Sequence, residues 1–488
     1  MMPQEKPAEL MPKDASASAA GEDLWSAELE QAHRDLSEVD VRFRRYAMRA
    51  PELLRGRNYE NMLYPAQAWP TFIGARKLAE FKRASRSACN LLRTIPGRFY
   101  RYDPARAVAL YQVSSAAELE RLLSPPNGSE TFVSRGDFIS TPQGFKCIEF
   151  NFTADLGGWE AGVLAANLRG VPALASFLAE QPETLSFTDP IVRLLHYILD
   201  TVPAEVIAKG ALNVVFVMYH LEQDELATGV GFELSGRTLR AAAAVAADAG
   251  FSTAVHFCRY EDLTTLHDRV YFGKTQIHAI VELDDQNRPP AIYQAFKRGG
   301  VLILDGPLGP LVSTKLNLAL AWELAGAWLL EDEEERVLFE VFPWTRQVLP
   351  GIVGFRGEQV AFAELLARRR EHLVLKREDS TGGKGVWMGR DTNAADWESL
   401  SRHALAEGTW VAQEIVEFVP YLYQCGERGY DVHDVIWGPF YFGETYGGTI
   451  LRMQPRKWDG PVNLSRHATQ GILFEVEPTT GAAGAGRG

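Results

Sequence analysis

The run of residues 130–152 constrains this chain more than any other stretch. It reads ETFVSRGDFISTPQGFKCIEFNF, two arms rich in β-branched and aromatic residues around the turn sequence TPQG. This pattern predicts an antiparallel hairpin. Arg135 and Asp137 occupy alternate positions on the first arm, and Glu149 and Asn151 do so on the second. Because residues two apart on a strand point to the same side, the segment predicts a hairpin with one polar face.

The polar face can be interpreted in two ways. The oxygens of Asp137, Glu149 and Asn151 are the hard ligands by which proteins bind Mg²⁺ while nucleotide phosphates complete its shell, so these residues are candidate metal ligands. Arg135 beside them could clamp a carboxylate or phosphate through two parallel hydrogen bonds. The plainer interpretation is the solvated outer face of an antiparallel sheet, and taken in isolation the four residues favour it.

Apolar periodicity organises the rest of the chain. Residues 24–92 carry apolar residues at three- and four-residue steps and predict helices, and another helix is expected over about 158–178. Within 212–303 the runs LNVVFVMY, FSTAVHF, QIHAIVEL and GVLILDGP predict strands, with TLRAAAAVAADAG as a helix between two of them. This alternation indicates a small parallel α/β unit. No GxGxxG follows its first strand, so a dinucleotide site is not supported.

Two lysines are candidates for contact with phosphate. Lys376 ends the strand LVL and precedes a glycine loop that contains Gly382, Gly383 and Lys384. The backbone N–H groups of such a loop can fold over phosphates. The loop is not a Walker A sequence, and an ordinary hairpin turn explains it equally well. Lys315 opens a helix after a Pro- and Gly-rich segment, where a solvated lysine is the plainer interpretation.

Two later strands carry the remaining candidates. Gln413, Glu414 and Val416 lie on WVAQEIVEF, which could offer backbone groups to an adenine edge, with Glu414 near the ribose hydroxyls. A half-buried strand explains this run as well. Arg452 lies on another strand and could stabilise charge on a reacting phosphate, although a surface arginine is the plainer interpretation. The polar loop behind it contains Asn463, Ser465 and His467.

Composition excludes several classes of protein. The 488-residue chain has a formal net charge of −13, which argues against nucleic acid as a partner but not against ATP, because ATP needs only a local basic cluster. Four separated cysteines without a CxxC pair predict neither a disulfide framework nor a structural zinc site. The N-terminus lacks the apolar core of a signal peptide, and the longest apolar run, residues 316–330, is too short for a bilayer. We therefore expect a soluble, cytoplasmic protein that binds neither nucleic acid nor membrane.

The order of these motifs resembles that of the circularly permuted ATP-grasp families, in particular the synthetase domain of glutathionylspermidine synthase. That family carries an Arg-x-Asp, then a Glu-x-Asn, then small residues before a Glu-Ala. Here Glu149 follows Asp137 by 12 residues, and the stretch 153–161 fits what comes next. The lysine strands come later, whereas in ordinary ATP-grasp enzymes they precede the Glu-x-Asn. The match covers residues 104–476 and continues in family order through Lys315, Lys376, the glycine loop, Gln413, Glu414 and Arg452.

The resemblance implies roles for these residues. Asp137, Glu149 and Asn151 would hold two Mg²⁺ ions, and Arg135 and Arg452 would bind a reacting acyl phosphate. ATP would be contacted by Lys315, Lys376, Gly382, Gly383, Lys384, Gln413, Glu414 and Val416.

The resemblance also implies a fold and a division of the chain. We expect an α/β (α+β) protein, a circularly permuted ATP-grasp with an inserted small parallel α/β domain of the pre-ATP-grasp type. The expected parts are a disordered tail (1–22), a helical N-terminal region (23–103), the metal-binding part of the grasp (104–205), the small α/β substrate-side domain (206–312), the nucleotide-binding part (313–476) and a loose tail (477–488).

The expected function is that of an ATP-dependent carboxylate–amine ligase, which forms an amide through an acyl phosphate and releases ADP and phosphate. Its partners would be a small-molecule or peptide carboxylate and an amine, and the chain could form a homodimer. Two alternatives remain open: a phosphotransferase that uses the same grasp, and a nucleotide-binding protein without catalysis. The amidase domain of the bifunctional synthase has no counterpart here, so hydrolysis is not expected.

Overall fold

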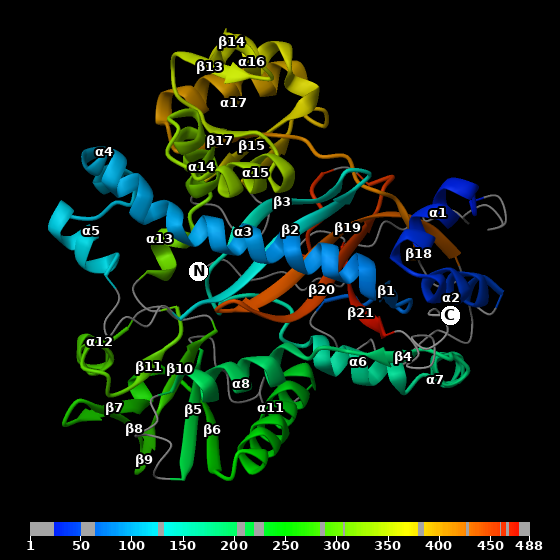
Figure 1. Cartoon of the computed structure of the whole chain (residues 1–488), viewed down its shortest axis with the longest axis vertical. Coiled ribbons are helices and arrows are strands. Elements are labelled where there is room, and N and C mark those ends of the chain that lie inside the picture. The colour runs from blue at the N-terminus through cyan, green and yellow to red at the C-terminus, as the bar shows by residue number, and fades with distance from the viewer. Residues whose placement is uncertain are drawn as a thin grey trace, which may run out of the picture.

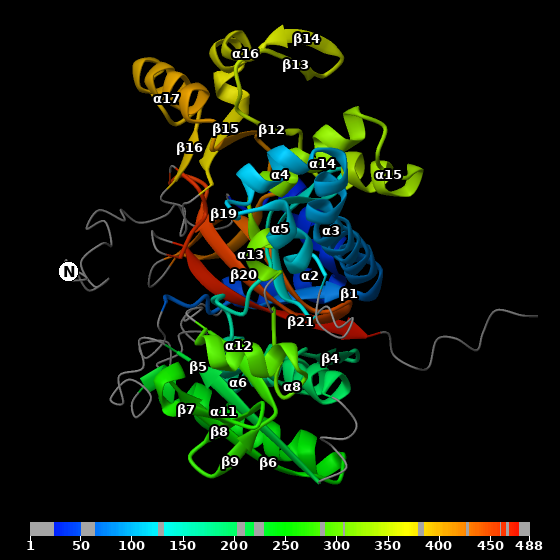
Figure 2. The ribbon, with the colours of Figure 1, turned by 90° about the vertical axis from the view of Figure 1, so that its left-hand side faces the viewer.

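The structure, a computed structural model, describes a mixed α/β protein in which a central sheet lies between two smaller lobes (Figures 1 and 2). The expected tails, apart from Glu477, lie outside the described residues, as do Gly382, Gly383, Lys384, Ser465 and His467. Within residues 229–232 only the backbone is described. The described residues are 24–49, 64–124, 131–202, 210–218, 229–283, 288–305, 308–378, 385–425, 429–458, 460–464 and 468–477.

The central sheet joins segments from the whole length of the chain. Its strand order is β1-β21-β20-β19-β2-β3, with β18 paired to β19 and β4 paired to β21. The first and last of these strands in sequence, β1 and β21, lie side by side in parallel. The strands are β1 (Thr71–Gly74), β2 (Val133–Thr141), β3 (Gly144–Asn151), β4 (Thr184–Ser186), β18 (Tyr421–Cys425), β19 (Gly429–Phe442), β20 (Thr445–Pro455) and β21 (Thr469–Glu477).

The helix α3 (Ala75–Tyr102) crosses one face of this sheet (Figure 1). Phe81 on α3 is fully buried, and its ring centroid lies 5.9 Å from that of Phe138, 4.7 Å from that of Phe145 and 5.6 Å from that of Trp437. Each such side chain contributes roughly 2 kcal/mol through burial. The α3 side of the sheet is therefore apolar core.

The expected hairpin is confirmed, and a bulge in it decides where its polar residues point. Asp137 pairs with Glu149 across β2 and β3, but the next residue, Phe138, pairs with Cys147. Ile148 is thus the extra residue of a β-bulge, which reverses the alternation along β3. Phe145 and Cys147 consequently lie in the core beside α3, while Glu149 lines the opposite side.

The N-terminal region is helical only in part. The helices α1 (Ala27–Leu36), α2 (Glu38–Arg49) and α3 agree with the predicted periodicity, but β1 interrupts the run. The sequence TFIG forms a strand because it pairs in parallel with β21. Local periodicity does not reveal this strand, because its partner lies about four hundred residues away in the chain. Two short helices, α4 (Pro104–Leu110) and α5 (Ala116–Leu122), follow.

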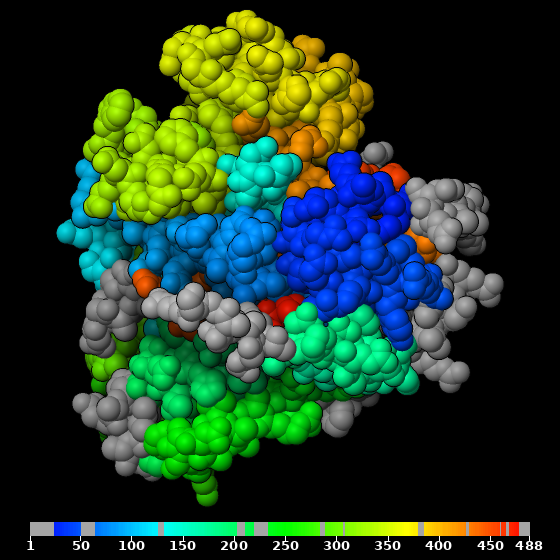
Figure 3. Space-filling model, turned by 45° about the vertical axis from the view of Figure 1, so that its right-hand side comes forward, coloured from blue at the N-terminus to red at the C-terminus, as the bar shows by residue number. Residues whose placement is uncertain are grey.

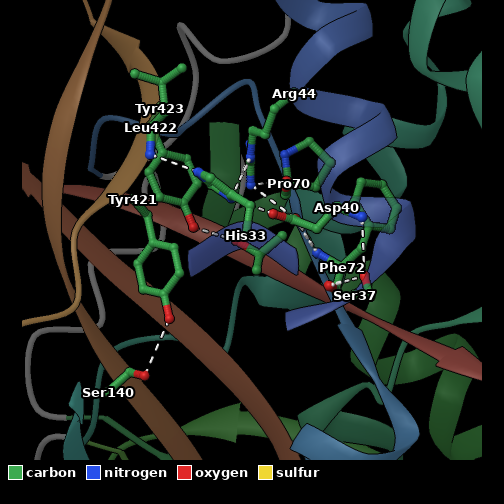
Figure 4. Close-up of polar contacts among 11 residues, drawn as sticks. His33, Ser37, Asp40, Arg44, Pro70, Phe72, Ser140, Tyr421, Leu422 and Tyr423 are labelled. Atoms are coloured by element: carbon green, nitrogen blue, oxygen red, sulfur yellow. Dashed lines mark hydrogen bonds and ion pairs between the residues drawn. The ribbon is translucent and has the colours of Figure 1, made fainter. Parts of the chain in front are cut away.

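A buried polar network fixes α1 and α2 to the central sheet (Figure 4). His33 Nδ1 lies 2.5 Å from Asp40 Oδ2, and Arg44 Nη2 lies 3.1 Å from Asp40 Oδ1. The N–H of Leu422 on β18 donates to His33 Nε2 at 2.9 Å, so Nε2 carries no proton and Nδ1–H donates to Asp40. The N–H of Phe72 on β1 also donates to Asp40 at 2.8 Å. Because His33, Asp40 and Arg44 are fully buried, this network determines where the two helices dock.

The lower lobe confirms the predicted parallel α/β unit. Its sheet has the order β11-β10-β5-β6, and all three pairings are parallel. The run QIHAIVEL was expected as one strand but forms two, because His278 separates β9, which joins a small antiparallel sheet, from β10. The elements are β5 (Ala211–Val217), α11 (Gly229–Asp248), β6 (Ser252–Cys258), β7 (Leu263–Leu266), β8 (Arg269–Phe272), β9 (Thr275–Ile277), β10 (Ala279–Glu282), α12 (Pro290–Lys297) and β11 (Leu302–Ile303).

The prediction of a single helix over 158–178 is wrong. This segment forms two helices, α6 (Ala161–Arg169) and α7 (Pro172–Ala179), whose axes are bent by 82°. Val171 has an extended backbone and Pro172 begins α7, because the residue before a proline avoids the helical region. Among the described residues no single helix is long and apolar enough to cross a membrane; the bent pair α6 and α7 reaches that length and composition only jointly. The helix α8 (Pro190–Thr201) follows.

The upper lobe contains a second antiparallel sheet with the order β12-β17-β15-β16, as its strand-rich sequence predicted (Figure 1). The strands β15 and β16 are antiparallel neighbours, so the two arms of the glycine loop pair as expected. The elements are α13 (Gly309–Ser313), α14 (Leu316–Gly326), α15 (Asp332–Val341), β12 (Thr345–Gln347), β13 (Ile352–Phe355), β14 (Glu358–Ala361), α16 (Phe362–Arg368), β15 (Leu373–Arg377), β16 (Val386–Met388), α17 (Ala394–Glu407) and β17 (Trp410–Glu414).

Candidate functional site

A cavity of about 460 Å³ lies between the central sheet and the antiparallel sheet of the upper lobe. Its walls come from β2, β3, β19 and β20 on one side and from β15, β16 and β17 on the other. We call it the inter-sheet cavity. Every sequence-predicted site residue that the structure describes lines it: Arg135, Asp137, Glu149, Asn151, Lys315, Lys376, Gln413, Glu414, Val416 and Arg452, together with Asn463 from the polar loop.

Asp137 lies between two arginines on one side of the cavity. Arg452 on β20 forms an ion pair with Asp137 Oδ1, and Arg135 Nε lies 3.7 Å from the same oxygen. Burial opposes the charge on Asp137, but the two guanidinium groups hold its pKa below the ordinary range. Burial, with the charge of Arg452, lowers the pKa of Arg135 to about 10. The three side chains are therefore charged near neutral pH although each is nearly buried.

The guanidinium groups retain hydrogen-bonding capacity for a ligand. Arg135 Nη1 donates to the carbonyl of Gly157, but the Nε–H groups of Arg135 and Arg452 are buried and have no hydrogen-bond acceptor among the described residues. Buried donors without acceptors are uncommon in proteins and cost free energy unless a ligand or water satisfies them. The two arginines are thus suited to bind an oxyanion.

The bulge at Ile148 connects the two sheets. Its carbonyl accepts from Lys376 Nζ on β15 at 2.9 Å and from Gln413 Nε2 on β17 at 3.3 Å. Burial lowers the pKa of Lys376, whereas the charge of Glu149 raises it. The sequence predicted Lys376 and Gln413 as nucleotide contacts, and the structure places both against the strand that carries Glu149 and Asn151.

Lys315 stands at the start of α14, where its Nζ lies 3.9 Å from Glu149 Oε1. Glu378, which sequence reasoning missed, holds this helix start in place. Its carboxylate accepts from the hydroxyl of Thr314 and, at 3.2 Å, from the N–H of Leu316. Burial raises the pKa of Glu378, although these donors oppose the shift. A signal was present in the sequence, because Glu378 lies two residues after Lys376 and so shares its side of the extended chain.

The connection after β17 forms the remaining wall. The run Gln413–Val416 was expected as one strand, but β17 ends at Glu414, and Val416 belongs to the following connection. Glu414 pairs with Arg356 on the β13–β14 turn. Beside this connection the cavity is apolar, with side chains from both sheets facing one another: Ile139, Ile148, Val374, Val386, Met388 and Ile436. An apolar slot between two sheets fits a flat heterocycle.

The donors of the predicted metal set fit a hard cation. Asp137 and Glu149 are direct register partners, and Asn151 lies two residues beyond Glu149, so two carboxylates and an amide oxygen line one cavity. Asp137 Oδ1 is buried without a hydrogen bond, although it is ion-paired with Arg452. Among the described residues no three His, Cys, Asp or Glu side chains gather into a metal-binding group, so a cation here would need the amide and further ligands from substrate or water.

Comparisons with known proteins show a shared fold. No family model matches the chain, and no curated protein matches its sequence. The structure is similar to that of a glutathione synthetase-like effector from Globodera pallida in its apo form, with a TM-score of 0.53 and 11% identity over 92% of this chain and 97% of that one. A putative gamma-glutamylcysteine synthetase from Methylobacillus flagellatus KT is similar with a TM-score of 0.38 and 12% identity, over 78% and 87% of the two chains. The first similarity shows a common fold, and the second carries no argument.

Proposed function

We propose that this protein is an ATP-dependent carboxylate–amine ligase of the circularly permuted ATP-grasp type. The observation that carries the proposal is the inter-sheet cavity, which gathers charged side chains beside an apolar slot between the central sheet and the antiparallel sheet of the upper lobe: Arg135, Arg452, Lys315, Lys376, Asp137 and Glu149. The glutathione synthetase-like effector, which shares the fold, supports the same class of chemistry.

The apolar slot and the connection after β17 would bind the adenine, with Glu414 near the ribose. Lys315 lies 3.9 Å from Glu149, and Lys376 is fixed by the carbonyl of the neighbouring residue Ile148. These lysines would neutralise the phosphates and keep them in line with the acceptor. Phosphoryl transfer needs mainly such positioning and charge stabilisation, so no protein nucleophile is required.

Arg135 and Arg452 would bind the substrate carboxylate and then the acyl phosphate that forms when its oxygen takes the γ-phosphoryl group and ADP leaves. Their buried Nε–H groups offer the donors this oxyanion needs. An amine then attacks the acyl carbon, phosphate leaves, and an amide results. Asp137, Glu149 and Asn151 would hold Mg²⁺, which supplies charge neutralisation between the phosphates when bound.

The test is ADP release in the presence of ATP, Mg²⁺ and hydroxylamine, against a panel of small carboxylates and peptides. Hydroxylamine traps an acyl phosphate as a hydroxamate, so a carboxylate-dependent hydroxamate is the expected result and also identifies the acid. ADP release with a stable phosphorylated product and no hydroxamate would indicate a phosphotransferase. Nucleotide binding without ADP release, across the whole panel, would indicate a binding protein. Either outcome would contradict the proposal.

A further inference from the structure

A second, larger cavity of about 800 Å³ lies on the other side of the connection after β17. It shares Glu414, Ile415 and Val416 with the inter-sheet cavity, but none of the candidate lysines or arginines of that site lines it. Its walls come from α14, α15, the β2–β3 turn, β12 and the β13–β14 turn. On the face shown in Figure 3 the yellow-green, cyan and yellow-to-orange segments that contain these elements adjoin one another. We call it the aromatic cavity.

Aromatic side chains line this cavity, and the indole N–H groups of two of them are already satisfied. The indole N–H of Trp322 donates to the carbonyl of Pro343 at 3.0 Å, and that of Trp344 donates to the carbonyl of Gly354 at 2.9 Å. Phe339 packs edge-on against Trp322, with ring centroids 5.1 Å apart. These side chains therefore present only apolar surface, so the body of an occupant must be apolar.

Arg346 is the exception in this lining. Its guanidinium carbon lies 5.5 Å from the ring centroid of Trp322 and 5.8 Å from that of Trp344. Among the described residues its one hydrogen bond runs from Nη1 to the carbonyl of Thr345 at 3.3 Å, and no carboxylate forms an ion pair with it. Burial lowers the pKa of Arg346 to about 10. The nearby charge of Glu323 opposes this shift, but Glu323 is itself paired with Arg106. A half-buried guanidinium normally has a carboxylate partner.

The other charged residues of the lining are mostly accounted for. Lys146 donates to the carbonyls of Phe339 and Glu340 near the end of α15. Arg356 pairs with Glu414, and Glu417 lies 3.4 Å from Arg390. Glu335 on α15 is the one acid of the lining outside an ion pair among the described residues. Arg346 is thus the cation available to an anionic ligand.

Trp328 adds a sign of function at the edge of this cavity. It follows α14 with a left-handed backbone, φ 60°, and its side chain is 85% exposed. A non-glycine residue in that conformation costs about 1 kcal/mol, and such strain gathers at ligand sites. Its chain neighbour Leu329, and Phe339 in the cavity lining, are also exposed large apolar side chains. Exposed apolar surface around a hollow marks a binding site.

We propose that the aromatic cavity is a second ligand site, which binds a small carboxylate with an aromatic body. The ring would lie among Trp322, Trp328 and Trp344, and the carboxylate would accept two hydrogen bonds from Arg346. Neither Arg346 nor the three tryptophans line the inter-sheet cavity, so the proposal stands whether or not the chain is a ligase.

The probes are 3-phenylpropionate and its neutral isostere 3-phenylpropionamide, titrated into the full chain by calorimetry. We expect saturable binding of the carboxylate and at least tenfold weaker binding of the amide, because an ion pair with a desolvated guanidinium is worth about 1.4 kcal/mol or more. No saturable binding up to about 10 mM, a concentration that detects even weak sites, would overturn the proposal. Equal binding of both probes would do so too.

Variants place the ligand in the cavity. Arg346→Met keeps the aliphatic chain between the indoles and should weaken 3-phenylpropionate at least tenfold. Gly326→Phe should abolish binding, because Gly326 lines the cavity and the new ring would occupy it. The variant should still fold, because an added Cβ at Gly326 meets no atom within 4 Å. Gly97→Phe is the matched control, since Gly97 lies on α3, lines neither cavity and has the same free space. The assignment would be overturned if Gly326→Phe bound the probe as the wild type does. It would also be overturned if two copies of the protein associated through this cavity and so excluded the probe.

Discussion

Asp137 shows how one residue can hold an arrangement of charge together. Its carboxylate pairs with both Arg135 and Arg452, two nearly buried guanidinium groups that would otherwise repel each other. Breaking a buried ion pair by removing one partner leaves an uncompensated charge and costs about 3–5 kcal/mol. The same carboxylate belongs to the proposed Mg²⁺ set, so a change at Asp137 should affect stability and the proposed catalysis together.

Asp137→Asn should therefore lose ATP turnover by at least about 100-fold, because charge stabilisation is usually the largest contribution to catalysis. ADP release measures the loss, and thermal unfolding of the same sample separates it from a loss of fold. Glu149→Gln is the companion variant, since Glu149 contacts Lys315 only at 3.9 Å and should lose turnover with less effect on unfolding. Turnover near that of the wild type in either variant would make the metal assignment wrong.

Asp40 offers a residue-scale test away from the site. In Asp40→Asn the buried Arg44 loses its charge partner, and we expect the free energy of unfolding to fall by about 3–5 kcal/mol. Glu38→Gln on the same helix is the control, because Glu38 forms an exposed ion pair with Arg34 and should change stability by less than about 1 kcal/mol. Denaturant unfolding followed by tryptophan fluorescence gives both values. Similar losses in the two variants would mean that the buried network contributes no more to the free energy of unfolding than an exposed ion pair does.

At the scale of elements, Glu378 ties the start of α14 to the end of β15, which carries Lys376. Glu378→Ala should free the first turn of α14 and weaken binding of a non-hydrolysable ATP analogue by roughly tenfold or more, since a hydrogen bond to a charged group is worth about 1.5–3 kcal/mol. Hydrogen exchange at Leu316 should accelerate in parallel. Glu371→Ala, an exposed acid before the same strand, should change neither. Slow exchange at Leu316 in Glu378→Ala would contradict this role.

Elements whose pairing partners lie close in the sequence could be predicted from it, and those whose partners lie far away could not. The β2–β3 hairpin and the parallel sheet of the lower lobe were predictable because their patterns are local: a turn with alternating arms, and strands alternating with helices. The strand β1 and the bulge at Ile148 were not, because both depend on neighbours elsewhere in the chain. For the site, the motif order predicted Arg135 and Arg452 on separate strands. Their meeting at Asp137 required β19 between β2 and β20.

At the scale of the whole molecule, the network around His33 makes the docking of the N-terminal helices sensitive to acid. Burial lowers the pKa of His33 below 6.5, and its Nε2 must stay unprotonated to accept from Leu422. Below pH 6.5 the unfolded chain binds a proton that the folded chain does not, so this contribution to stability is complete above pH 6.5 and falls as the pH is lowered. The slope is about 1.4 kcal/mol per pH unit for one proton.

His33→Gln isolates this effect. A glutamine amide can donate to Asp40 and accept from Leu422 but does not titrate, so the stability of the variant relative to the wild type should rise as the pH falls from 7 to 5. Thermal unfolding at a series of pH values measures the difference. Parallel pH profiles would show that His33 binds protons equally in the folded and the unfolded chain, which would contradict this role.

The parallel pairing of β1 with β21 also bears on how the protein is made. Residues 71–74 leave the ribosome long before residues 473–476, their sheet partners, have been translated. Until then α3 and the β2–β3 hairpin lack the three strands β19–β21, which lie between β1 and β2 in the sheet. The nascent chain must hold a large apolar surface through most of its synthesis, which makes it a natural client for chaperones. A premature stop codon before β21 should therefore yield an aggregation-prone fragment.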